Sequence, residues 1–262
     1  MGFKCGIIGL PNVGKSTLFN ALTESNKAEA ANYPFATIEP NVGRVAVPDE
    51  RLEILGKIGK SEKIIASYMD FVDIAGLVKG ASKGEGLGNK FLGHIREVDA
   101  IAHVVRCFND KNITHVSNII DPLNDIEIIN TEILLADIET LESKKNSLEK
   151  KSRQGDKEIL NRISIIEKLI NNLSVFNSLE NGFLEEDNEF IKTLNLITIK
   201  PMLYICNVDE ESAQNGNELS KKVSEYANKN KDNSVVVSAS IESQIAELEN
   251  NEEKLEMIKE MG

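Results

Sequence analysis

A short segment near the start of the chain has the residue types and spacing of a phosphate-binding loop. Residues Gly9–Ser16, GLPNVGKS, match the pattern GxxxxGK[ST] in full, between an apolar run (Phe3–Ile8) and a helix-like run (Ser16–Thr23). In such a loop, backbone N–H groups surround the β-phosphate, the lysine neutralises the β- and γ-phosphates and the serine hydroxyl binds Mg²⁺. We therefore expect a catalytic role for Lys15. The expected nucleotide contacts are Pro11, Asn12, Val13, Gly14, Lys15, Ser16 and Thr17.

Two further segments have the residues that a triphosphate and its magnesium ion need. Residues 73–76, DIAG, end an apolar run, so that Asp73 can hold Mg²⁺ through water and the N–H of Gly76 can approach the γ-phosphate. Thr37 lies between the phosphate-loop helix and the next strand, where a P-loop switch protein places the threonine that completes the Mg²⁺ shell. The six glycines from Gly76 to Gly93 predict a segment that becomes ordered only on binding. The expected metal ligands are Ser16, Thr37 and Asp73.

The elements around these motifs predict an α/β fold. Apolar runs of strand length alternate with amphipathic or glycine-punctuated stretches of helical length, a pattern typical of a mainly parallel sheet with helices on both faces. The expected strands are Phe3–Ile8, Val42–Val47, Ile65–Val72, Ala100–Cys107, Met202–Cys206 and Ser234–Val237. The expected helices include Ser16–Thr23, Asn89–Val98 and an acidic stretch, Ile241–Met261.

One long stretch has helical spacing only and predicts an inserted arm. Two apolar series lie on either side of a glycine-containing reversal near Gly155, which indicates an antiparallel helical hairpin. The first series is Leu134, Ile138, Leu141 and Leu148, interrupted at Lys145; the second is Ile159, Ile163, Ile166, Ile170 and Leu173. We expect the arm to span residues 125–194 and the nucleotide domain to comprise residues 1–124 and 195–262.

The tip of this hairpin is basic although the chain is acidic. Residues 144–157 contain six basic residues and two acidic ones, a net charge of +4, whereas the whole chain has 30 Lys and Arg against 42 Asp and Glu, a net charge of −12. A solvated helix face is the usual explanation of such a run. The alternative is contact with RNA phosphates through Lys150, Lys151 and Arg153.

Taken together, these motifs resemble those of one family. Residues 9–17, 35–42 and 73–82 are similar to the motifs of the Obg-like ATPases, the YchF family of translation-factor-class P-loop NTPases, and the similarity extends to about Ser240. The resemblance implies a small-GTPase-like fold with an inserted coiled-coil arm, and action on ribosomes. It also implies a C-terminal domain of TGS type, which we expect this chain to lack because too few residues follow Ser240.

The base site is expected to favour adenine. GTPases read guanine with Asn-Lys-x-Asp after a buried strand, whereas this chain has Asn207-Val208-Asp209-Glu210, so that Val208 removes the lysine and Glu210 is a methylene too long. Because N1 of adenine is an acceptor, a carboxylate aimed at that edge would face a lone pair. The resemblance implies adenine contacts from Asn207 and from the backbone near Val208, under a loop formed by Ser238, Ala239 and Ser240. A degenerate guanine site, or guanine reading by Asp209, is the open alternative.

Hydrolysis is expected to be slow. Leu77 stands where a GTPase has its water-orienting residue, and an aliphatic side chain can neither orient nor deprotonate water. Of the three histidines, His103 lies inside a buried strand and His94 in an amphipathic helix, whereas His115 follows a polar stretch from which it can approach the phosphates. We expect a catalytic role for His115, with an ordinary exposed loop histidine as the alternative.

A potassium ion is a further expected cofactor. Asn12 matches the asparagine with which related NTPases help to bind K⁺ beside the β- and γ-phosphates. The alternative is a loop asparagine that satisfies its own backbone.

Composition narrows the remaining function classes. With 41% hydrophobic residues the chain is globular, and because no apolar run approaches the ~18–20 residues of a membrane span we expect a cytoplasmic protein with no membrane partner. Cys5, Cys107 and Cys206 have neither disulfide nor metal spacing and are expected to be buried thiols. The acidic total argues against a nucleic-acid coating protein, and no sequence-specific DNA binding is expected.

The sequence thus predicts a Mg²⁺-dependent ATP-binding and ATP-hydrolysing switch that docks on ribosomes through its arm. The alternatives are a GTP-preferring GTPase of the same fold and a nucleotide-binding scaffold with negligible hydrolysis. A metabolic kinase is disfavoured because no second substrate site is recognisable.

Overall fold

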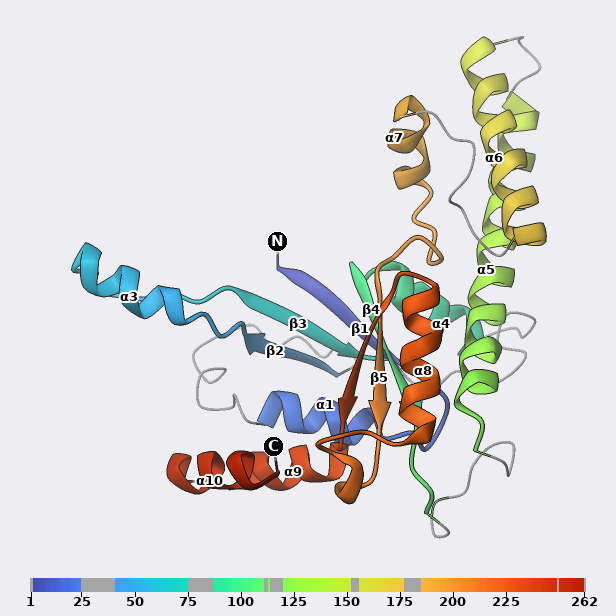
Figure 1. Ribbon diagram of the computed structural model, residues 1–262. Coiled ribbons are helices and arrows are strands. Elements are labelled where there is room, and N and C mark those ends of the chain that lie inside the picture. The colour runs from blue at the N-terminus through green and yellow to red at the C-terminus, as the bar shows by residue number, and fades with distance from the viewer. Residues whose placement is uncertain are drawn as a thin grey trace. The chain divides into compact units, whose positions relative to one another are not determined.

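The structure is a computed structural model in two compact units (Figure 1). It describes residues 2–24, 41–74, 87–110, 113, 120–151, 156–176, 185–248 and 250–261. The sheet unit comprises Met1–Gly76, Glu97–Asp125 and Pro201–Gly262, and the arm unit comprises Leu77–Arg96 and Ile126–Lys200. No helix among the residues so described has the length and apolar character needed to cross a membrane.

The sheet unit is built on a six-stranded sheet in the order β2-β3-β1-β4-β5-β6. In this spatial order, β3, β1, β4, β5 and β6 pair in parallel with their neighbours. Among these six strands only the edge strand β2 is antiparallel to its neighbour, β3. The strands are β1 (Phe3–Ile8), β2 (Val42–Ala46), β3 (Tyr68–Asp73), β4 (Ala100–Arg106), β5 (Met202–Asn207) and β6 (Asn233–Val237). The predicted mainly parallel α/β sheet is confirmed.

Helices that follow the strands pack onto this sheet. α1 (Lys15–Glu24) contacts β2 and β3 and lies against α9 (Ala239–Glu247), while α8 (Glu218–Lys229) covers β5 and β6. The ring of Tyr226 on α8 meets that of Tyr204 on β5 edge to face, with centroids 5.8 Å apart. The acidic stretch predicted as one helix is two, α9 and α10 (Asn251–Met261), because the backbone is extended at Leu248.

The sheet unit also contains a helix in the β2–β3 connection that was not predicted from the sequence. α3 (Glu50–Gly59) interrupts the connection between β2 and β3 and starts at Asp49, whose carboxylate accepts the N–H of Arg51. None of its side chains is buried, so its apolar residues do not mark a core face. Figure 1 shows it projecting from the sheet at the ends of β2 and β3.

The three cysteines are free and buried, as predicted. Burial raises the pKa of the Cys5 thiol to about 11, so this thiol stays protonated at neutral pH.

A buried histidine gives the sheet unit a pH-dependent stability. His103 on β4 is 1% exposed, and burial, assisted by the positive charge of Lys15, lowers the pKa of His103 from 6.5 to about 3. Between these values the unfolded chain binds a proton that the folded chain does not, so the unfolding free energy falls as the pH drops from 6.5 toward 3. At pH 5 the loss relative to neutral pH is about 2 kcal/mol.

Urea unfolding at pH 7 and pH 5 measures this effect. In a His103→Phe variant, whose ring can still pack beside Tyr204, the pH-dependent loss should shrink by that amount. Equal losses in parent and variant would contradict the assignment.

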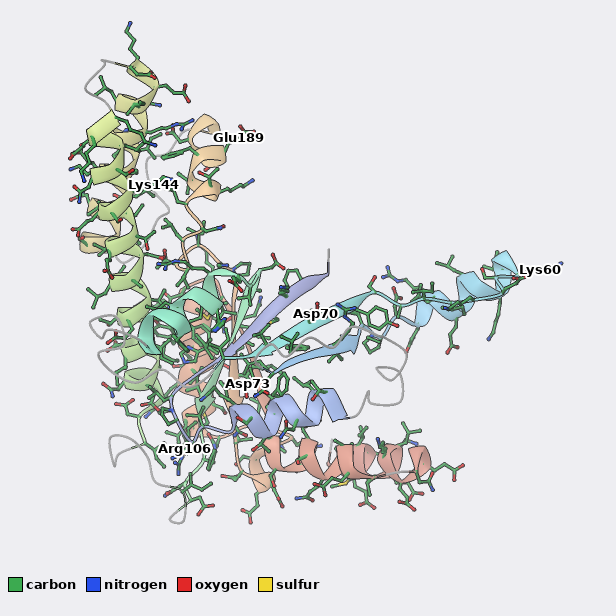
Figure 2. All side chains as sticks on the ribbon, turned by 180° about the vertical axis from the view of Figure 1, so that it is seen from behind. Lys60, Asp70, Asp73, Arg106, Lys144 and Glu189 are labelled. Atoms are coloured by element: carbon green, nitrogen blue, oxygen red, sulfur yellow. The ribbon has the colours of Figure 1, made fainter. Side chains whose placement is uncertain are left out.

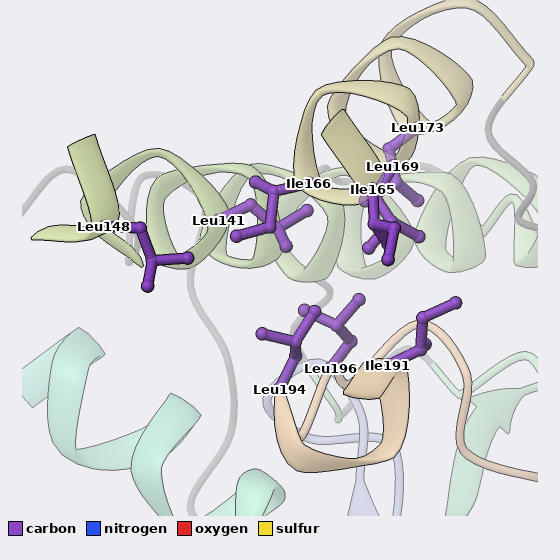
Figure 3. Packing of buried hydrophobic residues seen from close by; sticks show 9 residues of the cluster. All are labelled: Leu141, Leu148, Ile165, Ile166, Leu169, Leu173, Ile191, Leu194 and Leu196. Atoms are coloured by element: carbon purple, nitrogen blue, oxygen red, sulfur yellow. The ribbon is translucent and has the colours of Figure 1, made fainter. Parts of the chain in front are cut away.

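The arm unit is a helical assembly around one apolar cluster. Its helices are α4 (Leu87–Arg96), α5 (Pro122–Lys151), α6 (Lys157–Phe176) and α7 (Glu185–Thr193). Figure 3 shows side chains from α5, α6 and the α7 segment converging on this cluster. Its buried members are Leu141, Leu148, Ile165, Ile166, Leu169, Leu173, Ile191, Leu194 and Leu196.

The predicted hairpin stripes lie in this cluster, with one difference. Most predicted positions on α6 are only partly buried, whereas Ile165 and Leu169, which the predicted series omitted, are fully buried. The buried stripe of α6 is wider because α7 packs against it as well as α5. Lys145, which interrupts the series on α5, bridges to α6: its ammonium lies 2.7 Å from the carboxylate of Glu167.

A buried carboxylate on α5 links this helix to α4 and to the segment that follows α7. Asp137 on α5 is fully buried, and its Oδ2 accepts the N–H of Thr198 at 2.8 Å and the hydroxyl of Thr198 at 2.9 Å. Its Oδ1 lies 3.5 Å from the guanidinium of Arg96 on α4, which also donates to the hydroxyl of Thr140 at 2.6 Å. Loss of this carboxylate would leave Arg96 and the Thr198 amide without a charged partner.

Asp137→Ala is therefore expected to lower the unfolding free energy of the arm unit by about 3 kcal/mol. Urea unfolding followed by circular dichroism measures the change. Glu189→Ala, at an exposed site on α7 labelled in Figure 2, is the control and should stay within ~0.5 kcal/mol of the parent. Equal stability of the two variants would refute the structural role of Asp137.

Candidate nucleotide site

The phosphate-binding loop lies between β1 and α1, as the sequence predicted. Its backbone is specialised at two glycines: Gly9 has φ +153° and a Cβ there would lie 2.5 Å from the carbonyl oxygen of Val104. Gly14 has φ +97°, and a Cβ there would collide with the side-chain nitrogen of Asn207. Both positions therefore require glycine. Asn12, also left-handed at φ 62°, is exposed at the tip of the loop.

The lysine of the phosphate-binding loop is buried, and its ammonium is held by a backbone carbonyl group. Lys15 is 7% exposed, and its ammonium donates to the carbonyl oxygen of Leu10 at 2.8 Å. Burial lowers the pKa of Lys15 to about 8, against the opposite effect of the negative charge of Asp73. Because a triphosphate would supply far more negative charge than a single carbonyl, a phosphate oxygen is the better partner for this ammonium.

Two of the three predicted metal ligands meet beside the loop. The hydroxyl of Ser16 donates to Oδ2 of Asp73 at 3.2 Å, and Figure 2 labels Asp73 where β3 ends. The other carboxylate oxygen, Oδ1, is buried with no hydrogen-bond partner among the described residues. A hydroxyl beside a carboxylate with a spare oxygen is a donor set that suits Mg²⁺.

Protein ligands alone do not complete this metal site. Nowhere in the described ranges do three or more His, Cys, Asp or Glu side chains gather in a metal-binding group. Mg²⁺ held by few side chains takes its remaining ligands from water and substrate phosphates. The geometry therefore fits a metal that arrives with the nucleotide.

Asn207 joins the phosphate loop to the segment after β6. It is 5% exposed at the end of β5, its Nδ2 donates to the carbonyl oxygen of Val13 at 2.8 Å, and its Oδ1 accepts the N–H of Ala239 at 3.0 Å. The second N–H of the Asn207 amide group is not used in these two bonds. Val208 is also buried and donates its N–H to Val237. The predicted phosphate and base segments are thus held together by one side chain.

The residues after Val208 have defined partners. Asp209 caps the short 3-10 helix η3 (Glu210–Ser212), accepting the N–H of Ser212 at 3.0 Å. Glu210 Oε1 accepts the hydroxyl of Ser240 at 2.7 Å and the amide of Gln244 at 2.9 Å, both from α9. The sequence analysis did not single out Gln244. In the structure α9 begins at Ala239, so Ser240 and Gln244 are four residues apart on one helix and lie on the same face.

The segment after β4 is held by a buried arginine that the sequence did not flag. Arg106, labelled in Figure 2, donates to the carbonyl oxygens of Phe108 at 3.3 Å, Asp110 at 3.1 Å and Ile113 at 3.0 Å. A buried guanidinium with three carbonyl acceptors fixes the start of the segment that leads to the predicted catalytic residue, His115. The candidates that lie outside the described residues are Thr37, Gly76, Leu77, His115 and Arg153.

The remaining predicted site residues belong to the base loop, the phosphate loop and the arm tip. Ser238 is buried at the start of α9, and its hydroxyl has no hydrogen-bond partner among the described residues. Pro11 and Thr17 flank the loop centre, partly buried and exposed respectively. In the arm unit, Lys150 and Lys151 are exposed at the end of α5.

Comparison with known proteins matches this site to one family. The family model described as 50S ribosome-binding GTPase matches residues 4–136. The chain is 53% identical over 265 residues to the ribosome-binding ATPase YchF of Haemophilus influenzae, covering all of this chain and 72% of that protein. It is 52% identical over 267 residues to the protein of the same name from Bacillus subtilis, with the same coverage.

The fold agrees with a solved structure. The YchF GTPase of Schizosaccharomyces pombe is 37% identical, with a TM-score of 0.83 over 99% of this chain and 71% of that chain. The expected small-GTPase-like fold and the resemblance to the Obg-like ATPase family are confirmed by these matches. The chain belongs to the YchF family of P-loop nucleoside triphosphatases.

Proposed function

We propose that this chain is a Mg²⁺-dependent ATPase that acts on ribosomes as a nucleotide-controlled switch in the cytoplasm. The observation that carries the proposal is a phosphate-binding loop in which Lys15 is buried and Ser16 meets Asp73, next to a base segment that lacks the guanine-reading side chains. Curated relatives that share about half of its residues are named ribosome-binding ATPases.

The choice of adenine rests on the residues after β5, because the names of similar proteins differ between ATPase and GTPase. Val208 is 3% exposed and apolar where a guanine reader has lysine. Asp209 is engaged as a helix cap, and Glu210 already accepts two hydrogen bonds through one oxygen. A guanine base would therefore lack a free bidentate carboxylate, whereas adenine needs none.

The phosphate-loop residues would support hydrolysis, which we expect to be slow because Leu77 stands where a GTPase has its water-orienting residue. Lys15 would stabilise the charge that develops on the β- and γ-phosphates, and Ser16 and Asp73 would hold Mg²⁺, which would supply further positive charge there. We assign proton transfer or water positioning to His115, approaching from the segment that Arg106 anchors. Thr37 and Gly76 would contact the γ-phosphate side, which makes them the switch residues. Asn12 is proposed to help bind K⁺ beside the phosphates.

Binding and hydrolysis measured in parallel with ATP and GTP test the nucleotide proposal. We expect tighter binding of ATP, slow phosphate release in Mg²⁺, none in excess chelator, and faster turnover in K⁺ than in Na⁺. Tighter binding of GTP would overturn the adenine assignment. Binding without single-turnover release would indicate a scaffold, and release that requires a second acceptor would indicate a kinase.

The ribosome proposal is tested on the arm tip. Reversal of Lys150, Lys151 and Arg153 to glutamate should weaken co-sedimentation with ribosomes, most strongly at low salt, because phosphate contacts are salt-dependent. The matched control reverses three exposed lysines of α8, Lys221, Lys222 and Lys229, in the sheet unit. Equal co-sedimentation of both triple variants would reject the tip as the contact.

A further inference from the structure

Glu210 is held from the side by helix α9. Its Oε1 accepts two hydrogen bonds, from Ser240 Oγ at 2.7 Å and from Gln244 Nε2 at 2.9 Å. Gln244 Nε2 also lies 3.3 Å from Ser240 Oγ, so the three side chains form one network. Each carboxylate oxygen has two lone pairs, so these two donors fill Oε1.

The second oxygen of this carboxylate is left for another partner. Among the residues that the structure describes, Oε2 of Glu210 has no hydrogen bond. Glu210 follows β5 by three residues, and the segment from Ser238 follows β6, which is the next strand of the parallel sheet. The carboxyl ends of neighbouring parallel strands are where nucleotides bind, so Glu210 lies at the edge of the sheet where the base of a bound nucleotide is expected.

We propose that Gln244 is a positioning residue that sets base selectivity by filling Oε1 of Glu210, an inference that rests on the proposed nucleotide function. A guanine base offers two N–H donors, at N1 and N2, that need both oxygens of a carboxylate. With Oε1 filled, only Oε2 can accept, so one of the two guanine donors stays unpaired, whereas adenine has no N–H donor at that edge. Gln244 therefore excludes guanine without touching the base.

The hydrogen-bond network around Glu210 can discriminate between guanine and adenine through the number of acceptors it leaves open. A site whose buried or engaged acceptors match one base leaves the donors of another base unpaired, and unpaired donors discriminate strongly. Ser240 alone supplies one donor to Oε1, so the second lone pair becomes available only when Gln244 is removed. Release of Glu210 would let its carboxylate turn as a bidentate acceptor toward guanine.

Calorimetric titration of Gln244→Met with Mg·ATP, Mg·GTP and Mg·ITP tests this proposal. Methionine keeps the side-chain length and removes the donor. We expect the ratio of GTP to ATP affinity to rise roughly tenfold relative to the parent, the value of one hydrogen bond to a charged group. ITP, which has the N1–H donor and no N2 amino group, should rise less than GTP.

A matched substitution controls for the loss of a glutamine amide. Gln214→Met replaces an exposed glutamine in the turn after η3 and should leave the affinity ratio unchanged. A ratio in Gln244→Met within about twofold of the parent, with folding intact by circular dichroism, would overturn the positioning role. The parent's own preference tests the proposed ATPase function separately, since the shift between variant and parent is read whichever nucleotide the parent prefers.

Discussion

Lys15→Met is expected to weaken binding of Mg·ATP by at least about 100-fold and to reduce hydrolysis below detection. The ammonium is the one charged donor that the described part of the phosphate loop offers, and methionine keeps the length of the side chain while removing that charge. In the free chain the hydrogen-bond partner of this ammonium among the described residues is the carbonyl oxygen of Leu10. The folded structure therefore gains little from the charge, whereas the triphosphate depends on it.

The stability of the same variant separates binding from folding. Burial disfavours the charged form and lowers the pKa of Lys15 to about 8, so removal of the charge should leave the melting temperature unchanged or raise it. Calorimetry with Mg·ATP and a thermal melt without nucleotide measure the two effects. Lys4→Met, at an exposed position on β1, is the control. Retention of parent-like ATP affinity in Lys15→Met would refute the assigned phosphate site.

The central strands β1, β4 and β5 were predictable because burial on both faces produces continuous apolar runs. The ends of strands depend on partners that the sequence does not reveal. A strand was expected from Ile65, yet β3 starts at Tyr68, which pairs with Ala46, the last residue of β2. The ladder ends just before Tyr68, where the carbonyl oxygen of Ser67 accepts the N–H of Val47, so the apolar character of Ile65 does not extend the strand.

The arm shows the same limit for helices. A heptad pattern describes one helix that meets one partner, and it correctly placed Ile166 and Leu173 in the buried stripe. It missed Ile165 and Leu169, because their burial comes from the second partner, α7, which is separated from α6 in sequence. A 3.5-residue repeat describes contact with one partner helix, so it does not indicate that a third helix packs against α6.

In the candidate site, motifs located the residues and the fold determined their roles. The resemblance implies a base contact from Asn207, which stays a prediction, and the structure shows that its amide joins two backbone segments. The pairing of Glu210 with Gln244 spans 34 residues and depends on α9 lying beside η3, which no local pattern encodes. Roles that arise from such long-range pairing become visible only in three dimensions.

Asn207→Asp is expected to damage both ends of the nucleotide site at once. The carboxylate keeps the shape of the amide but has no N–H, so an oxygen would face the carbonyl oxygen of Val13, now 2.8 Å from the donating Nδ2. Repulsion between these buried acceptors, with loss of one buried hydrogen bond, should lower the unfolding free energy by about 3 kcal/mol. Because Val13 belongs to the phosphate loop, ATP affinity should also fall at least about tenfold.

Thermal melts with and without Mg·ATP distinguish these two losses. In the parent, a ligand at 100 times its dissociation constant adds about 2.7 kcal/mol to the unfolding free energy, and a tenfold loss of affinity in the variant at the same concentration halves that gain. The carbonyl of Val13 and the amide of Ala239 both depend on Asn207, so Asn207→Ala should show a smaller loss than Asn207→Asp: it removes the bonds without adding a charge. If the aspartate variant keeps the full nucleotide-induced stabilisation, Asn207 does not connect the phosphate loop to the base segment. If it loses that stabilisation while alanine retains part of it, the connection acts through the Val13 carbonyl.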